Sequence, residues 1–164
     1  MSDLTPKPPS ASATEMVQVV LPNDANPLGY ILGGTVMHLV DIAAAIAAHR
    51  HTRERVVTAA IDGVRFLHPI KVGDLIILRA RVNATFTTSL EVEVEVFSEE
   101  ALTGTRQLTS HAYLTFVAID GHGGRVPVTP LLLESDADRQ RSDAARARRA
   151  ERLEKRREAS ETEK

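Results

Sequence analysis

The segment Asn26–Gly34 and the apolar run that follows it constrain the fold of this chain more than any other feature. Gly33 and Gly34 let the backbone turn sharply and leave their N–H groups uncovered by a Cβ atom, which suits a helix start that approaches a ligand closely. From Thr35 to Ala48 nearly every residue is apolar. This composition predicts a helix surrounded by protein on nearly every side, so the other segments have to supply a layer around it.

Asp41 is the only charged residue in the apolar run. A carboxylate in the middle of such a helix is costly to bury unless it has a partner or a task. His38, three residues earlier, is within reach of a hydrogen bond to Asp41, but a packed helix histidine is the simpler interpretation. We therefore predict that Asp41 carries a function.

The remaining segments have the patterns of strands in an antiparallel sheet. Gly63 lies inside one of them, which predicts a bulge or bend. In another, three glutamates alternate with apolar residues and are expected to face Arg79 and Arg81 on the neighbouring strand. One helix and one such sheet make an α+β domain in which the sheet wraps around the helix, and its uncovered face and edges favour a homo-oligomer. The expected strands are 15–21, 56–66, 75–84, 90–96 and 106–119.

The two ends of the chain differ from this central domain, which we place at residues 15–130. Residues 1–14 are rich in proline and serine, and we expect a disordered lead-in. Residues 131–164 form a charged C-terminal helix or tail, with Ser135 followed by Asp138 as a capping start. Residues 136–164 contain ten basic and eight acidic residues, and Leu153 is their only large apolar side chain. The tail is interpreted as a partly frayed surface helix, with oligomer contact or binding of an anionic ligand as the alternatives.

Composition excludes several classes of function. The formal net charge of −2 gives no reason to expect nucleic acid or an anionic membrane as a partner. The chain has no cysteine, which excludes disulfides, thiolate metal sites and a thiol nucleophile and makes the cytoplasm the default location. No segment has the length and apolarity of a signal peptide or a membrane span. His49 and His51 are two residues apart and do not share a helix face, so no metal site is expected.

Taken together, these segments resemble the hotdog-fold acyl-CoA thioesterases of the long-chain, brain-type and YciA-like group. The resemblance covers about residues 15–130, and its segments occur in matching order and spacing. The charged tail is also similar to the C-terminal helix of some members. The motifs are Asn26, Gly29, Gly33-Gly34, Met37 and Asp41, then Val57-Thr58-Ala59, Asp62, Phe66, Pro69-Ile70 and Gly73-Asp74, then Thr88 to Val92, and finally Thr115 to Asp120 with Val126-Pro127.

The resemblance implies hydrolysis of acyl-CoA to a free acid and coenzyme A, a step of fatty acid metabolism, at a site between two hotdog subunits. In this family the site pairs an asparagine before the glycines of one subunit with an aspartate on the central helix of the other, here Asn26 and Asp41. Relatives are often trimers of dimers, that is, hexamers. Many members have histidine before the two glycines, where this chain has Leu32. No cofactor is implied, because coenzyme A is part of the substrate.

The chemistry of the residues agrees with that implication. A thioester needs an attacking water or carboxylate and a stabiliser for its carbonyl oxygen as that oxygen becomes negative. The Gly34 N–H at the helix start is the expected stabiliser, with Gly33 beside it at the substrate. Asp41 acts either as general base or as nucleophile, and the sequence leaves both open. Thr58 and Ser89 are expected to make further substrate contacts.

Two other functions are compatible with the sequence. The first is another acyl-thioester enzyme of the same fold, such as a dehydratase, since one fold hosts several chemistries. The second is a non-catalytic module that binds acyl-CoA. Release of free thiol from acyl-CoA would distinguish the hydrolase from both.

Overall fold

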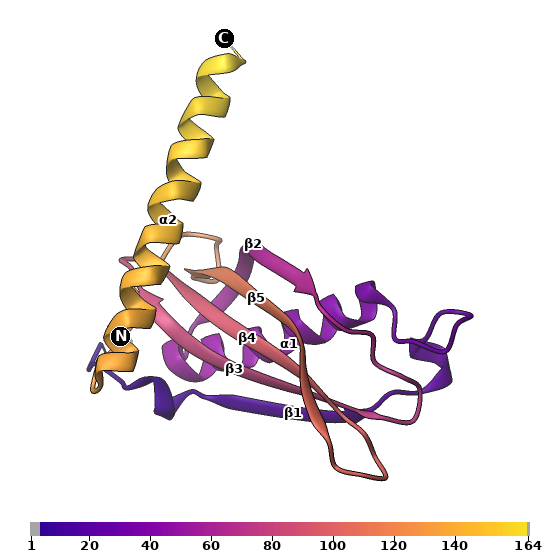
Figure 1. Cartoon of the computed structure of the whole chain (residues 1–164). Helices are drawn as coiled ribbons and strands as arrows, with labels where there is room; N and C mark the ends of the chain where they lie inside the picture. Colours follow the sequence, from indigo (N-terminus) through magenta and orange to yellow (C-terminus); the bar gives the residue numbers. More distant parts are fainter. Residues whose placement is uncertain (1–3, 164) are drawn as a thin grey trace.

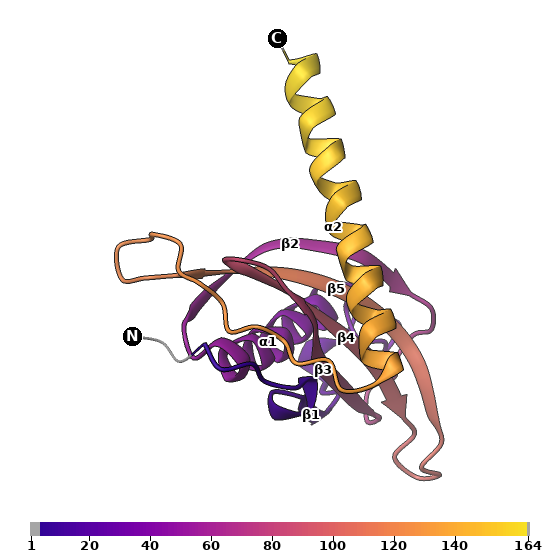
Figure 2. The same ribbon diagram turned by 90° about the vertical axis from the view of Figure 1, so that its left-hand side faces the viewer.

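The computed structural model describes residues 4–163 and shows a five-stranded antiparallel sheet wrapped around one helix. The strand order is β1-β3-β4-β5-β2, so β1 and β2 are the two edges. Helix α1 lies on the concave face, and a second helix, α2, crosses the outer face (Figures 1 and 2). In chain order the elements are β1 (Thr14–Val19), α1 (Gly33–Thr52), β2 (Arg55–Phe66), β3 (Leu75–Thr85), β4 (Ser89–Glu99), β5 (Arg106–Ile119) and α2 (Asp136–Thr162), with short 3-10 turns at Pro9–Ala11 and Pro22–Asp24.

One side of α1 packs on the sheet through small side chains. Ala43, Ala44, Ala47 and Ala48 are fully buried, and their size lets the strands approach the helix closely. Phe116 is the largest buried side chain among those that face them from the sheet. The core therefore lies between α1 and the concave face.

The prediction that α1 is surrounded on nearly every side is wrong for the single chain. Met37, Asp41, Ile42 and Ala45 form a stripe along the helix that is only half buried. The physical reason is that one sheet can cover only one side of a helix. A largely apolar stripe that its own chain leaves half open is a surface that another copy can cover.

The strand predictions are confirmed with shifts of a few residues at their ends. Gly63 has a φ of 64°, and the register with β5 shifts between Asp62 and Arg65, as the predicted bulge requires. A second register shift follows Thr58, which the sequence did not indicate. Opposite charges do face each other across β3 and β4, but the arginines of β3 form their ion pairs elsewhere, Arg79 with Glu15 at 2.9 Å and Arg81 with Asp138 at 3.0 Å.

The expected disordered lead-in is corrected for residues 4–14, while residues 1–3 lie outside the described part. Lys7 forms a parallel bridge to Leu131: its N–H donates to the Pro130 carbonyl at 3.1 Å, and its own carbonyl accepts from the Leu132 N–H at 2.8 Å. Pro9 is buried as well. Proline fixes an extended backbone at little entropic cost, so this stretch can pack without forming a long strand.

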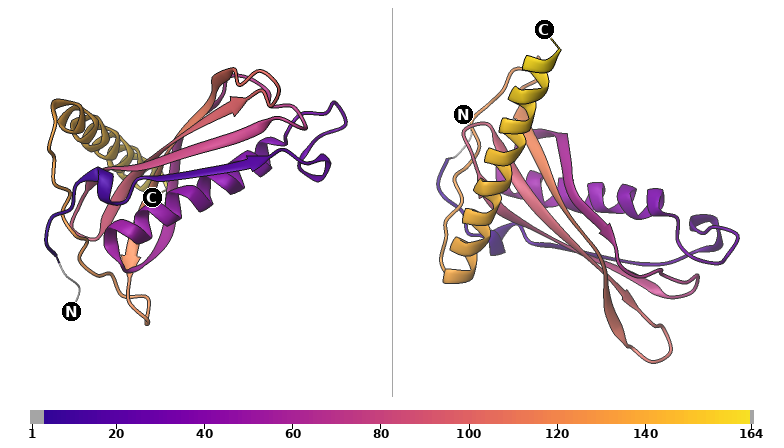
Figure 3. Two further views of the ribbon diagram at one scale, coloured as in Figure 1. Left: turned by 90° about the horizontal axis from the view of Figure 1, so that it is seen from below. Right: turned by 45° about the horizontal axis from the view of Figure 1, so that its top comes forward.

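Helix α2 begins as predicted, because the Ser135 hydroxyl accepts from the Asp138 N–H at 3.1 Å. Its first half is not a free surface helix. Ser142 and Ala145 are buried against the outer face of the sheet, and Arg148 reaches Glu91 at 2.7 Å. Its second half continues past β2 (Figures 1 and 3). Within residues 4–163, no helix combines the length and apolarity needed to cross a membrane.

His51 joins the end of α1 to both terminal segments. Its Nε2 lies 2.8 Å from the Thr129 carbonyl, and its own carbonyl accepts from Lys7 Nζ at 3.0 Å. A carbonyl can only accept, so Nε2 carries the proton and Nδ1 is the bare nitrogen, which is buried without a partner. Burial lowers the pKa of His51 from its usual value by more than the Thr129 hydrogen bond raises it. The folded state therefore keeps His51 neutral.

We expect the free energy of unfolding to fall as the pH drops below about 6.5, the usual histidine value. The unfolded chain binds a proton at His51 there and the folded chain does not, so folding loses up to about 1.4 kcal/mol per pH unit until the lowered pKa is reached. Urea unfolding between pH 7.5 and 5 measures this slope. A His51→Gln variant, which keeps an N–H donor for Thr129, should show a smaller slope.

The control for this experiment is His122→Gln, a change at an exposed turn. It should keep the slope of the unchanged protein. Equal slopes for His51→Gln and the unchanged protein would contradict a neutral buried His51.

Candidate active site

Asp41 and Thr58 meet where the middle of α1 crosses β2. The Thr58 hydroxyl donates to Asp41 Oδ1 at 2.7 Å. Asp41 as a residue is half buried, while Thr58 is exposed, and Oδ2 has no hydrogen-bond partner among the residues that the structure describes. Thr58 thus fixes one carboxylate oxygen and leaves the other to accept a proton or to attack.

The N-terminus of α1 presents open backbone donors. The helix begins at Gly33 after Leu32, and no side chain caps it. A Cβ added at Gly34 would meet nothing within 4 Å, so the space beside its backbone is open. A Cβ added at Gly33 would lie 3.6 Å from the ring of Phe66. Unpaired N–H groups at the positive end of a helix favour a developing negative charge. Gly34 lies seven residues before Asp41, about 10 Å along the axis.

Asn26 uses one end of its amide for the loop that leads into α1. Its Oδ1 accepts from the N–H groups of Leu28 at 3.0 Å and Tyr30 at 3.1 Å, and its backbone N–H donates to the Tyr30 carbonyl at 2.8 Å. Oδ1 is therefore committed to the turn. The Nδ2 group is left as a donor for a bound molecule.

Asn26 and Gly33 line one cleft of about 280 Å³, and Asp41 does not line it. Phe66 and His68 lie in the same cleft. No site role was assigned to these two residues from the sequence. The signal that marks Phe66 is its place, with Pro69, among the motifs of the family resemblance, and in the structure its ring is 55% exposed. The expected site residues thus fall into two groups within one chain, Asn26 with the helix start and Asp41 with Thr58.

Ser89 belongs to neither group. Ser89 pairs across the sheet with Val117. The next residue, Leu90, pairs with Phe116, and the side chains of Leu90 and Phe116 point into the core beneath α1. Neighbouring residues of a strand point to opposite faces, so Ser89 lies on the outer face. The single chain therefore does not bring Ser89 together with Asp41.

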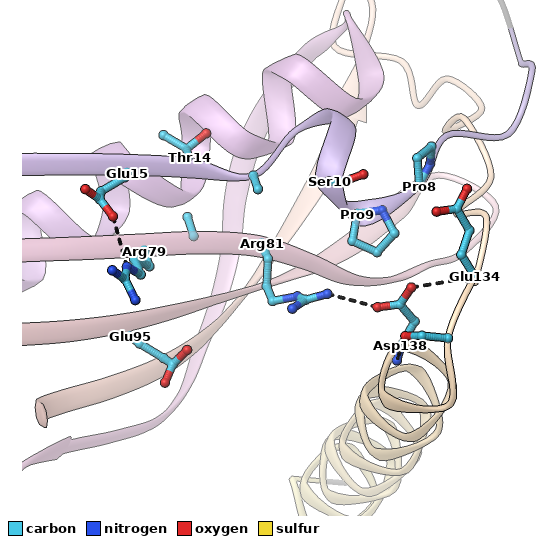
Figure 4. A pocket seen from close by; sticks show the side chains of 13 residues that line it. Pro8, Pro9, Ser10, Thr14, Glu15, Arg79, Arg81, Glu95, Glu134 and Asp138 are labelled. Carbon is cyan, nitrogen blue, oxygen red and sulfur yellow. Dashed lines mark hydrogen bonds and ion pairs between the residues drawn. The ribbon is translucent and has the colours of Figure 1, made fainter.

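A larger cleft of about 660 Å³ lies between residues 8–15, β3 and the start of α2 (Figure 4). Arg79 and Arg81 reach into it, and each is paired with a carboxylate, Glu15 and Asp138 respectively. None of the expected site residues lines this cleft. The cleft lies where the N-terminal segment comes close to the start of α2. Across residues 4–163, no three His, Asp or Glu side chains gather as a metal site would require.

Comparison with known proteins agrees with this geometry. The model of the Thioesterase superfamily matches residues 28–105. YkhA of Bacillus subtilis, named an uncharacterized acyl-CoA thioester hydrolase, is 40% identical over 119 residues, which cover 73% of this chain and 69% of that protein. The chain spans only 39% of the human cytosolic acyl coenzyme A thioester hydrolase, to which it is 30% identical.

Solved structures extend the similarity to nearly the whole chain. An acyl-CoA hydrolase from Staphylococcus aureus, solved with butyryl coenzyme A, coenzyme A and coenzyme A disulfide, is 36% identical, with a TM-score of 0.87 over 95% of both chains. A hexameric acyl-CoA thioesterase is 38% identical, with a TM-score of 0.88 over 92% of this chain and 97% of that one. The predicted hotdog fold is confirmed, and the chain belongs to the thioesterase superfamily.

Proposed function

We propose that this protein hydrolyses acyl-CoA thioesters to a free carboxylic acid and coenzyme A, at a site built from two copies of the chain. The observation that carries the proposal is the 2.7 Å hydrogen bond from Thr58 to Asp41, which orients a half-buried carboxylate on the same helix whose N-terminus is open. The family membership supplies the class of reaction.

The proposed reaction needs an attack on the thioester carbonyl carbon and a donor that stabilises the carbonyl oxygen. Asp41 Oδ2 either takes a proton from a water molecule that attacks the thioester carbonyl carbon, or attacks that carbon itself to give an anhydride that water then cleaves. In both routes the carbonyl oxygen becomes negative and accepts from the Gly34 N–H of the copy that supplies Asn26. The carbon–sulfur bond breaks, the thiolate leaves with coenzyme A and takes up a proton, and the acid is released.

Asn26 Nδ2 would position the water or the carboxylate, and Gly33 would contact the substrate beside Gly34. No cofactor enters this scheme beyond the coenzyme A of the substrate. Ser89 remains a proposed substrate contact only for a molecule that reaches the outer face. The cytoplasm stays the expected compartment.

Three features support a site shared by two copies. Asn26 and Asp41 belong to separate groups within one chain, and the stripe of α1 that carries Asp41 is half open. The edge strand β2 has no partner on its free side and exposes Val57, Ile61 and Phe66. Open strand edges pair readily with a second chain. A dimer would hold two sites, each with Asp41 of one copy and Asn26 of the other, and three such dimers would form a hexamer like the hexameric relative.

The Staphylococcus aureus hydrolase supports the choice of residues. Its solved variants replace an asparagine, an aspartate and a threonine by alanine, and the three positions are separated by 15 and 17 residues. Asn26, Asp41 and Thr58 have the same order and the same separations here.

Replacing Asp41 by asparagine should abolish thiol release. The amide keeps an oxygen for Thr58 but cannot take a proton or attack, so we expect a loss of about 10²-fold to 10⁴-fold at unchanged thermal stability. Free thiol is measured on a panel of short to long acyl-CoA esters. Asp143→Asn, at an exposed position on α2, is the control and should keep full activity. An active Asp41→Asn protein would remove the proposed base.

The roles of the Oδ1 acceptor and the Nδ2 donor of Asn26 can be distinguished by two substitutions. Asn26→Asp keeps the oxygen that accepts from Leu28 and Tyr30 and loses the Nδ2 donor, so stability should stay within about 0.5 kcal/mol while thiol release falls. Asn26→Ala loses both and should destabilise the fold by about 1–2 kcal/mol. Chemical unfolding and the thiol assay on both variants test this split. Full activity of Asn26→Asp would exclude the donor role.

Mixing two inactive variants tests the shared site. In a dimer of one Asp41→Asn copy and one Asn26→Asp copy, one site carries both changes and the other carries none. Random reassortment makes half of the dimers mixed, so activity should recover to about one quarter of that of the unchanged protein. The variants are unfolded together and refolded, and each variant refolded alone is the control. No recovery would show that Asp41 and Asn26 act within the same copy.

A further inference from the structure

The face of α2 that packs on the sheet continues beyond the sheet. Buried and half-buried positions recur along the helix at 141 and 142, 145, 148 and 149, and 152. Arg152, the last of them, reaches Asp62 on β2 at 3.1 Å. With the same spacing the stripe continues through Arg156 and Ala159, where the helix has passed the edge of its own sheet. Residues 153–162, which we name the overhang, extend into open space in Figures 1 and 3.

Charge follows the same stripe. Over the sheet, two arginines of the stripe pair with carboxylates below them: Arg148 with Glu91 at 2.7 Å and Arg152 with Asp62 at 3.1 Å. Arg149, beside them, lies over the ring of Phe86 instead. Arg156 is the next cation on the stripe, and no ion pair or hydrogen bond of its side chain occurs within residues 4–163. The sheet carboxylate that shares its cleft, Asp62, is paired with Arg152. In another copy Glu91 is equally paired and buried, whereas Asp62 keeps 40% of its side chain exposed although it pairs with Arg152, so Asp62 can accept a second cation.

A cleft of about 500 Å³ lies under the start of the overhang, between α2 and the β2 edge at Asp62 and Gly63. Arg156 and Ala159 line it from the helix. Gly63 adds no side chain to it, so another strand can come close to β2 there. This is the space that a sheet continued past β2 would enter.

The overhang has little to hold it in place within one chain. All of its residues are exposed, and the interactions seen among residues 4–163 run along the helix itself. They are ion pairs such as Lys155 with Glu151 at 2.8 Å, and hydrogen bonds from the Ser160 and Thr162 hydroxyls to carbonyls of the preceding turn. Such pairs contribute about 0.2–0.5 kcal/mol each, and a short helix without packing is marginal in water.

We infer that the overhang is a clasp between two copies: when the free edges of two β2 strands pair, it lies across the outer face of the second copy's sheet, with Ala159 at the contact and Arg156 toward the partly exposed Asp62 of that sheet. This inference rests on the two-copy arrangement proposed above. It assigns the tail to oligomer contact, one of the alternatives left open by its sequence.

A spin label provides the direct test. The chain has no cysteine, so Ala159→Cys gives one attachment site. Ala150→Cys is the matched control, because it lies nine residues earlier on the opposite, exposed side of α2. In the assembled protein the label at 159 should be restricted in its motion and the label at 150 mobile. Equal mobility at both positions, or restriction at 159 that persists after dilution to monomer, would overturn the clasp.

A charge at the contact should also weaken the assembly. Ala159→Glu should raise the dissociation constant between two copies about tenfold or more, and Ala150→Glu should change it less than about twofold, as measured by sedimentation velocity over a dilution series. Equal dissociation constants for the two variants would contradict the contact. Thiol release is measured separately: an active enzyme with a mobile label at 159 removes only the clasp, and an inactive enzyme with a restricted label removes only the proposed hydrolysis.

Discussion

The structure depends on the close contact between the alanine face of α1 and the concave face of the sheet. Four fully buried alanines bring the helix axis near the strands, and this approach places Asp41, on the adjacent stripe, within hydrogen-bond distance of Thr58 on β2. A larger side chain at Ala44 or Ala47 would push α1 outward and separate the carboxylate from the hydroxyl. Packing in the core therefore sets the geometry of the candidate site.

The same contact leaves the molecule incomplete. One sheet covers only one side of α1, so the stripe with Asp41 stays half open, and the edge of β2 is also free. A second copy can cover the stripe and pair with this edge. On the outer face, ion pairs hold α2 to carboxylates of the sheet, and the last of these pairs is made with the edge strand β2. The proposed shared active site and the proposed clasp both follow from pairing of β2 with the same strand of a second copy.

Features with a local signal were predictable from the sequence. The glycine pair marks the start of α1, Gly63 marks the bulge and Ser135 marks the start of α2, because each acts on backbone within a few residues. The packing of Lys7 beside Leu131 was missed, since its partners are more than 120 residues away. The outer-face position of Ser89 was missed although it was readable, because Leu90 is a core residue and strand neighbours alternate.

The most direct test of this account is a crystal structure of the Asp41→Asn variant with an uncleaved short acyl-CoA. The account requires the thioester carbonyl oxygen within hydrogen-bond distance of the Gly34 N–H, with Asn26 of the same copy and position 41 of the other copy on either side of the carbonyl carbon. A thioester bound between Asn26 and position 41 of one copy, or in the cleft beside Arg79 and Arg81, would contradict it.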